Sequence, residues 1–205
     1  MDLQDRVMID VSTLAGVDEA GRGPIAGDVY AAAVILPRHY NLTGLTDSKK
    51  LSDKKKDRLF DEIRDQALAY AITKASLEEI ESLNILHASL LAMKRAVESL
   101  KPSPEYVLVD GNRVPDFDPS AIFHAEPLIK GDERCDAVSA ASILAKVARD
   151  RAMLALHEQY PMYGFAQHKG YPTKAHLLAL QMHGVSCVHR QGFGPVARLL
   201  TSATD

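Results

Sequence analysis

The stretch GVDEAGRGPIAG, residues 16–27, follows an apolar segment with two acids and then a glycine-rich turn. Residues 12–18 and 28–36 have strand character, and this turn joins them. The turn is similar to the phosphate-binding pattern G-x-x-x-x-G-K-[ST], but the Lys and the Ser or Thr are absent. Asp18 and Glu19 inside the turn would also repel a triphosphate. We therefore exclude a phosphate loop.

The adjacent carboxylates of Asp18 and Glu19 are better explained as ligands of a hard cation such as Mg²⁺, which prefers oxygen ligands. Neighbouring residues of a strand point to opposite faces, so these two side chains converge only if the chain turns sharply after them. Gly21, Arg22 and Gly23 supply that turn, and the glycines let the backbone approach a ligand closely. The stretch predicts a strand that ends at a cation site.

The run VLVDGN, residues 107–112, is a second apolar segment that ends in an acid. Its composition is typical of a central strand covered on both faces. Asp110 would then lie at the carboxyl end of the strand, where α/β sheets bind their ligands. Asp-Gly is also a common hairpin turn, and the pattern taken alone favours that hairpin.

The segment KGDERCDAVSAASILAKVARDR, residues 130–151, predicts a helix lined with small residues that permit close packing. Four polar residues recur on one helix face, at Ser139, Ser142, Lys146 and Arg149. Two hydroxyls and two cations in a row suit contacts with phosphates, although a solvated surface stripe has the same spacing. Either Asp132 or Asp136 adds an acid near the helix start, where an acid can also serve as a cap.

The whole chain alternates strands with long helices. Helices are predicted at 52–69 and 77–100, strands at 70–76, 106–111 and 121–131, and mainly helices from about residue 133, with a loop at 160–173. This alternation predicts an α/β domain with a mixed sheet flanked by helices. We expect residues 1–158 to form the main domain and residues 159–205 a small helical extension packed on it.

Composition narrows the class of protein. With 205 residues, 46% hydrophobic and 25% charged, the chain is typical of a soluble globular protein. It shows no signal segment and no apolar run long enough to span a bilayer, and Cys135 and Cys187 match no metal spacing. We expect reduced thiols in a cytoplasmic protein without a membrane partner.

The net charge of −3 is unevenly distributed along the chain. Residues 1–28 hold six acids and two arginines, whereas residues 146–198 hold seven Lys or Arg and two acids. Such asymmetry is compatible with a polyanion site, and charge on solvated helices explains it equally well.

Several motifs in order, GVDEAGRGP, DSKKL, LNILHASLLAM, VDGN, KGD, SAASILAKVARDR and YGFAQHKGYPT, show that the sequence resembles bacterial ribonuclease HII from about residue 14 to residue 198. The resemblance implies a ribonuclease H-like fold with a helical C-terminal extension. It also implies cleavage of the RNA strand of RNA–DNA hybrids, nicking of duplex DNA at embedded ribonucleotides, and a need for Mn²⁺ or Mg²⁺. We expect a monomeric enzyme.

The resemblance also assigns roles to residues. It implies a catalytic set of Asp18, Glu19, Asp110 and Asp132, with Asp136 as the alternative fourth carboxylate. The first three would hold two metal ions for phosphodiester hydrolysis that leaves 3′-OH and 5′-phosphate ends. Gly21, Arg22 and Gly23 would sense the ribose 2′-hydroxyl, which donates and accepts hydrogen bonds. Lys49 would contact a phosphate, and Tyr163 would stack on the substrate. One departure is Arg190-Gln191-Gly192-Phe193 where the family usually has Arg-Arg-Ser-Phe.

Two other classes of function fit parts of this pattern. A DNA nuclease or transposase-like protein can share the acidic site, but it has no 2′-hydroxyl for the Gly-Arg-Gly turn to sense. A nucleic-acid-binding module without activity would have no need for four intact carboxylates. Cleavage of a duplex with one ribonucleotide, compared with an all-DNA duplex, distinguishes these classes.

Overall fold

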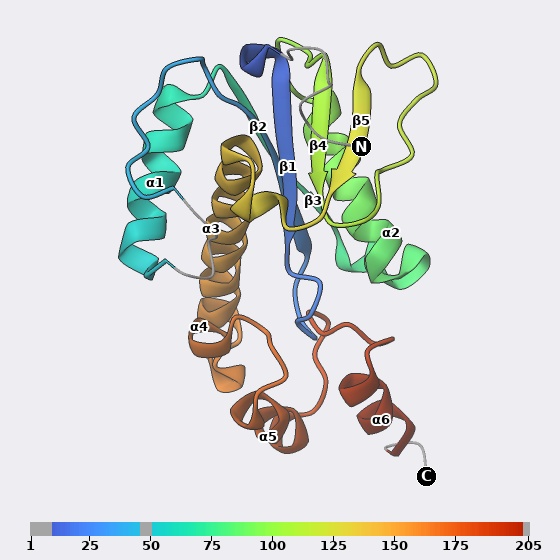
Figure 1. Cartoon of the computed structure of the whole chain (residues 1–205). Coiled ribbons are helices and arrows are strands. Elements are labelled where there is room, and N and C mark those ends of the chain that lie inside the picture. Colours follow the sequence, from blue (N-terminus) through green and yellow to red (C-terminus); the bar gives the residue numbers. More distant parts are fainter. Residues whose placement is uncertain (1–9, 46–50, 203–205) are drawn as a thin grey trace.

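The computed structural model describes residues 10–45 and 51–202, which form one five-stranded mixed sheet with flanking helices (Figure 1). The strands are β1 (Leu14–Ala20), β2 (Val29–Ile35), β3 (Ala69–Ala75), β4 (Tyr106–Asp110) and β5 (His124–Leu128). Their order is β3-β2-β1-β4-β5. β2 is antiparallel to β1 and β3, whereas β4 is parallel to both β1 and β5. The predicted α/β fold with a mixed sheet is confirmed.

Three long helices cover the sheet. α1 (Asp53–Gln66) and α3 (Asp136–Gln159) lie on one face, and α2 (Leu77–Glu98) lies on the other (Figure 1). Short helices α4 (Phe165–His168), α5 (Lys174–His183) and α6 (Gly194–Ser202) follow below α3, and single 3₁₀ turns occupy Val11–Thr13, Gly131–Glu133 and Pro161–Tyr163. Within the described ranges, no helix has the length and apolar character that crossing a membrane requires.

The sequence of strand β2 is almost continuously apolar because both of its faces are buried. Ala31, Ala33 and Ile35 belong to the cluster beneath α2, whereas Ala32 and Val34 belong to the cluster beneath α1 and α3. Successive side chains of a strand alternate between faces, and here both faces are covered by helices. Hydrophobic residues are therefore required at every position instead of every second one.

The small residues of α3 allow this helix to lie close against β1. Ala140, Ala141 and Ala145 are fully buried. A Cβ atom added to Gly16 of β1 would lie 2.1 Å from the backbone nitrogen of Val138. The predicted close packing is therefore present, and it requires glycine at position 16 because backbone atoms cannot yield as a flexible side chain can.

Helix α2 is interrupted where one continuous helix was predicted. Asn84 has φ 66° and ψ 164°, outside the helical region. Its Oδ1 accepts hydrogen bonds from the backbone N–H of Leu86 (3.0 Å) and of His87 (3.2 Å). Asn84 thus caps a second helical segment, a role that suits Asn because its short side chain competes with the backbone for hydrogen bonds.

The Asp110-Gly111 pair ends a strand of a parallel pair and does not form a hairpin. β4 pairs in parallel with β5, with Tyr106 opposite His124 and Asp110 opposite Leu128. A parallel neighbour requires the chain to return to the other end of the sheet, and residues 111–123 make that crossover. VLVDGN therefore forms a strand between two others, and the hairpin is excluded. The expected burial of both faces is incomplete, because Val107 and Val109 are buried whereas Leu108 is half-buried.

A third hydrophobic cluster connects the C-terminal helices to the rest of the protein. It joins Ile25 and Ala26 of the glycine-rich segment and Met153 of α3 to residues beyond position 160, namely Tyr163, Phe165, Leu180, Val188 and Val196. The cluster agrees with a C-terminal segment packed on the sheet domain. The boundary between residues 158 and 159 stays a prediction.

The contact between β1 and α3 predicts the effect of a single methyl group. Gly16→Ala should lower the free energy of unfolding by about 3 kcal/mol or more, because its Cβ overlaps backbone atoms that must shift. Chemical denaturation followed by circular dichroism measures this value. Gly192→Ala is the matched control, since its Cβ would meet only the flexible carboxylate of Glu81 at 3.3 Å. Equal stability losses in the two variants would contradict the proposed close packing.

Candidate active site

The carboxyl ends of β1 and β4 lie side by side and bring acids from two distant parts of the sequence into one cleft. Because the strands are parallel, with Val17 opposite Val109, the residues that follow these positions emerge at the same edge. Asp18, Glu19 and Asp110 line a cleft of about 230 Å³. Residues 20–23 and the side chains of Ser142, Lys146, Arg149 and Tyr171 complete its wall.

The acids of the cleft are electrostatically strained. Burial raises the pKa of Asp18 well above its usual range, and the nearby charges of Glu19 and Asp110 raise it further. A hydrogen bond from the Ser142 hydroxyl opposes this increase. Burial also raises the pKa of Glu19, and Arg22 opposes it from 3.5 Å. The neighbouring carboxylates thus disfavour one another's ionised form, and a bound cation would relieve this repulsion.

The three carboxylates have hydrogen-bond or ionic partners within the protein. Asp18 Oδ1 accepts the backbone N–H of Glu19 at 2.7 Å, and Asp110 Oδ1 accepts that of Gly131 at 2.7 Å. In residues 10–45 and 51–202, no three His, Cys, Asp or Glu side chains come close enough together to enclose a metal ion. The acids therefore lie in one cleft and influence one another's charge, but their side chains do not converge on a single point.

The structure separates the two alternatives for a fourth carboxylate. Asp136 is exposed at the start of α3 and accepts a hydrogen bond from the hydroxyl of Tyr40. Asp132 is buried, with 8% exposed, directly after the Gly131 amide that donates to Asp110. Asp132 is thus adjacent in the chain to a contact with the acidic set, although the described residues that line the cleft do not include it.

The glycine-rich turn passes directly over Arg149. Gly21 has φ 109°, and a Cβ atom there would lie 2.2 Å from Arg149 Nε. Only glycine fits this position, because both the space and the backbone conformation exclude a side chain. Arg149 is 1% exposed and its Nη2 donates to the carbonyl of Ala26 at 3.3 Å. Arg149 thus lines the cleft as a nearly buried side chain beneath the turn and not as part of an open stripe, and its contact with phosphate stays a prediction.

The remaining residues of the α3 face divide between the cleft and the core. Ser142 and Lys146 line the cleft, and Lys146 Nζ also contacts Asp150 Oδ1 at 2.7 Å. Ser139 is buried, with 2% exposed. The helical spacing was correct, but one face of a long helix passes from the cleft into the core. Lys49 lies outside the described residues.

The structure corrects the expectation for Tyr163. This side chain is buried in the third hydrophobic cluster, where its hydroxyl donates to the carbonyl of Gly184 at 2.9 Å and its ring stacks on Phe165. The ring, which is 5% exposed, and its hydroxyl are thus both used within the protein. Tyr171, eight residues further in the same quoted motif, lines the cleft instead and is 43% exposed. A Cβ atom on Gly23 would lie 3.3 Å from its ring.

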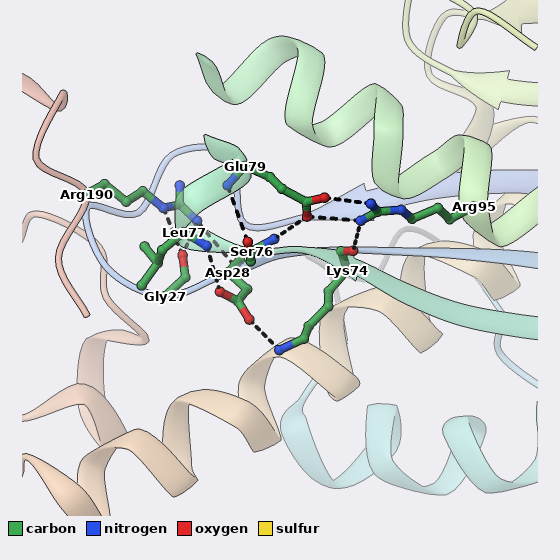
Figure 2. A network of polar contacts seen from close by, with 8 residues as sticks. All are labelled: Gly27, Asp28, Lys74, Ser76, Leu77, Glu79, Arg95 and Arg190. Carbon is green, nitrogen blue, oxygen red and sulfur yellow. Dashed lines mark hydrogen bonds and ion pairs between the residues drawn. The ribbon is translucent and has the colours of Figure 1, made fainter. Parts of the chain in front are cut away.

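Arg190 is a second residue whose importance the sequence did not reveal. It is fully buried, and its guanidinium donates to the carbonyls of Pro24 (2.8 Å) and Gly27 (2.8 and 2.7 Å). Figure 2 shows the adjoining contacts, in which Asp28 accepts hydrogen bonds from Lys74 Nζ (2.7 Å) and from the N–H of Leu77 (3.2 Å). The retained Arg of Arg190-Gln191-Gly192-Phe193 therefore fixes the far end of the glycine-rich segment. Gln191 and Gly192 replace the two residues after it, and the Gly192 N–H lies 3.2 Å from Glu81.

A mixed sheet of this order, with carboxylates at the ends of β1 and β4, defines an enzyme with the ribonuclease H-like fold. Residues 15–194 match the model of a family described as Ribonuclease HII. A protein named Ribonuclease HII from Marinomonas sp. (strain MWYL1) is 59% identical over 187 residues, which are 91% of this chain and 92% of that protein. The chain belongs to the ribonuclease HII family.

Solved structures agree with this assignment. The ribonuclease H2 from Pyrococcus horikoshii OT3 superimposes with a TM-score of 0.77 at 26% identity, covering 94% of this chain and 99% of that one. Bst-RNase HIII, solved in complex with Mn²⁺, gives a TM-score of 0.72 at 19% identity and covers 96% of this chain and 71% of that one. At this low identity, the likeness to Bst-RNase HIII shows only that the fold is shared.

The crowded acids predict a stability effect that requires no substrate. Because ionised Asp18 is disfavoured in the folded state, the acidic cluster destabilises the fold as pH rises above the usual carboxyl range. Without divalent metal at pH 7, Asp110→Asn should raise the thermal midpoint by about 2–4 °C, the shift that ~1 kcal/mol produces in a protein of this size. Addition of Mg²⁺ or Mn²⁺ should raise the thermal midpoint of this variant less than that of the unchanged protein.

Differential scanning fluorimetry with EDTA, Mg²⁺ or Mn²⁺ measures both effects. Asp116→Asn, an exposed acid outside the cleft, is the control and should change neither midpoint. An Asp110→Asn midpoint that falls in EDTA, with the metal-dependent rise intact, would show that Asp110 is not part of the repelling set.

Proposed function

We propose that Asp18, Glu19 and Asp110 hold two divalent cations with which this protein hydrolyses RNA next to or within DNA. As a member of the ribonuclease HII family it is an endoribonuclease that acts on the RNA strand of RNA–DNA hybrids. It nicks duplex DNA at embedded ribonucleotides and leaves 3′-OH and 5′-phosphate ends. The observation that carries the proposal is the single cleft shared by three carboxylates and the Gly-Arg-Gly turn.

The donor set fits Mg²⁺ or Mn²⁺. The acids that line the cleft offer carboxylate oxygens, which are the ligands that such hard cations take. When bound, two such ions supply an activated water and stabilise the leaving oxygen of the phosphodiester. Ser142 holds the Asp18 carboxylate in place by its hydrogen bond. We assign Asp132 as the fourth carboxylate because it is the buried one of the two candidates and is next to the Gly131 contact with Asp110.

The glycine-rich turn supplies the selectivity for ribose. Gly21 and Gly23 leave backbone N–H and C=O groups unshielded by side chains at the edge of the cleft. Such groups can pair with a 2′-hydroxyl, which donates and accepts, without regard to the base. Arg149 and Arg190 hold the turn from below and from its far end, so its backbone groups are fixed before the substrate arrives. Arg22 and Lys146 provide positive charge for the phosphates on either side.

Tyr171 is the aromatic residue that would contact the substrate. Its ring lies beside Gly23 and it is partly exposed at the cleft. A flat ring in this place packs against the face of a deoxyribose, whereas a 2′-hydroxyl on that sugar would crowd it. Tyr171 would therefore sense the nucleotide that follows the ribonucleotide, while Gly21–Gly23 sense the ribonucleotide itself. Lys49 would contact a phosphate.

The central experiment compares three duplexes, one with a single ribonucleotide, one RNA–DNA hybrid and one of DNA alone. With Mg²⁺ or Mn²⁺ the protein should cut the first two at ribonucleotides and leave the third intact, and EDTA should stop all cleavage. Asp110→Asn should abolish cleavage while the fold persists, because the amide has the carboxylate shape without its charge. Asp116→Asn should cut normally. Cleavage of the all-DNA duplex, or full turnover by Asp110→Asn, would refute the proposed function.

Tyr171 and Tyr163 give opposite predictions. Tyr171→Ala should lower kcat/KM on the single-ribonucleotide duplex about tenfold, the loss expected when one aromatic stacking contact of ~1–3 kcal/mol is removed. Its thermal midpoint should change little, because the ring is partly exposed. Tyr163→Phe loses a buried hydrogen bond and should lower the midpoint while kcat/KM stays near normal. Steady-state kinetics and thermal unfolding of both variants measure these effects, and the reverse pattern would return the substrate contact to Tyr163.

A further inference from the structure

Three histidines surround the loop that carries Tyr171, outside the acidic cleft. His176 is fully buried, His189 is 3% exposed, and His168 stacks on His176 with ring centroids 4.3 Å apart. The three rings pack against Phe165. Histidines buried beside one another raise the question of which ring nitrogens carry protons, and their contacts answer it.

Hydrogen bonds at both ends fix the proton positions. His176 Nδ1 lies 2.9 Å from the carbonyl oxygen of Tyr171, which can only accept, so Nδ1 carries a proton. His189 Nδ1 lies 3.2 Å from the backbone nitrogen of Ser186, whose N–H can only donate, and 2.8 Å from the Ser186 hydroxyl, which can donate as well, so this nitrogen carries no proton. His189 therefore has its proton on Nε2, and His176 has a free Nε2. These two atoms lie 3.2 Å apart, and the donor faces the acceptor.

The chain of contacts runs in one direction, from Ser186 through His189 and His176 to the carbonyl of Tyr171. It exists only while both rings are neutral, because a proton added to His176 would set two N–H groups against each other. Burial lowers the pKa of His176 to about 4 and that of His189 to about 4. The other titratable groups against the pair are His168 and Tyr163, and the next residue along the chain is Arg190. The rings are therefore neutral at pH 7.

Residues 186–190, where this series of hydrogen bonds begins, also hold the glycine-rich turn. The backbone N–H of Arg190 donates to Ile25 (2.8 Å), that of Gly27 donates to Val188 (2.9 Å), and that of Ile25 donates to Gly170 (2.9 Å). Residues 186–190 thus contact the glycine-rich segment directly and Tyr171 through the histidines. Residues 186–190 therefore position both elements assigned to sugar recognition, Tyr171 and the glycine-rich turn.

We propose that His176 and His189 are positioning residues that set Tyr171 at a fixed separation from the Gly21–Gly23 turn. Neither ring touches the substrate. The pair acts through the Tyr171 carbonyl, and this inference rests on the proposed function because Tyr171 contacts the substrate only there. The Tyr171 ring lies against Gly23, and both residues line the cleft, so a shift of the loop alters the wall that faces the sugar without altering the acids.

The test is a double-mutant cycle between His189 and Tyr171. His189→Phe keeps a ring against Tyr163 and removes both hydrogen bonds, whereas His189→Gln keeps an N–H near the position of Nε2. His189→Phe should weaken binding of a single-ribonucleotide duplex in EDTA at least fivefold. It should also raise KM with little change in kcat. His189→Gln should bind almost as tightly as the unchanged protein. In a Tyr171→Ala background, His189→Phe should have less than a twofold effect. His183→Phe, an exposed histidine beside Tyr163, is the control and should bind normally.

Nuclear magnetic resonance gives a readout that does not depend on activity. Two-bond ¹H–¹⁵N spectra of the unchanged protein at pH 7 should show His176 protonated on Nδ1 and His189 on Nε2. The opposite tautomers, or a charged ring, would overturn the proposal even if His189→Phe fails to fold. Equal losses from His189→Phe with and without Tyr171 would overturn it as well, because they indicate a general loss of structure. A protein that cuts no ribonucleotide-containing duplex refutes the proposed function, while the spectra and the duplex affinity still decide the positioning role.

Discussion

The buried guanidinium of Arg190 donates five hydrogen bonds to backbone carbonyls of residues 22–28. Burial lowers its pKa to about 9, so the charge persists at neutral pH and must be satisfied inside the protein. Carbonyl oxygens of the glycine-rich segment satisfy it, and this requirement gives the segment one conformation. Asp28, at the end of the segment, is held in turn by Lys74 and the start of α2 (Figure 2). These hydrogen bonds offset the large conformational entropy that a turn rich in glycine loses on ordering.

The sheet topology sets where negative charge gathers. β1 is central and has β4 as its parallel neighbour, so the acids that end these strands emerge at one edge. Helix α3 lies close enough to β1 for Ser142 to reach Asp18, and Gly16 makes that approach possible. The cost is a set of carboxylates with raised pKa values in the protein without metal. The proposed binding of divalent cations by this cleft would offset that loss of stability.

The C-terminal segment completes a cleft whose acids come from the sheet. It contributes Tyr171 to the cleft wall, and it contributes Arg190 and the histidine pair behind that wall. The third hydrophobic cluster contains residues of the glycine-rich segment and of the C-terminal helices together, so packing joins the two parts. The cleft therefore combines segments more than 140 residues apart in sequence, such as Gly23 and Tyr171.

Local pattern in the sequence determined the strands, the long helices, the sharp turn after Asp18 and Glu19, and the small residues of α3, because these follow from alternation, helical spacing and glycine content. Taken alone it favoured a hairpin at Asp110-Gly111, and it did not reveal that Tyr163 and Arg149 are buried. Only the tertiary structure decided these points. Tyr163 and Tyr171 lie in one motif, and Arg149 and Lys146 lie on one helix face, so their local patterns are alike. What separates them is burial by distant segments, since Phe165 and Gly184 enclose Tyr163 and the glycine-rich turn covers Arg149.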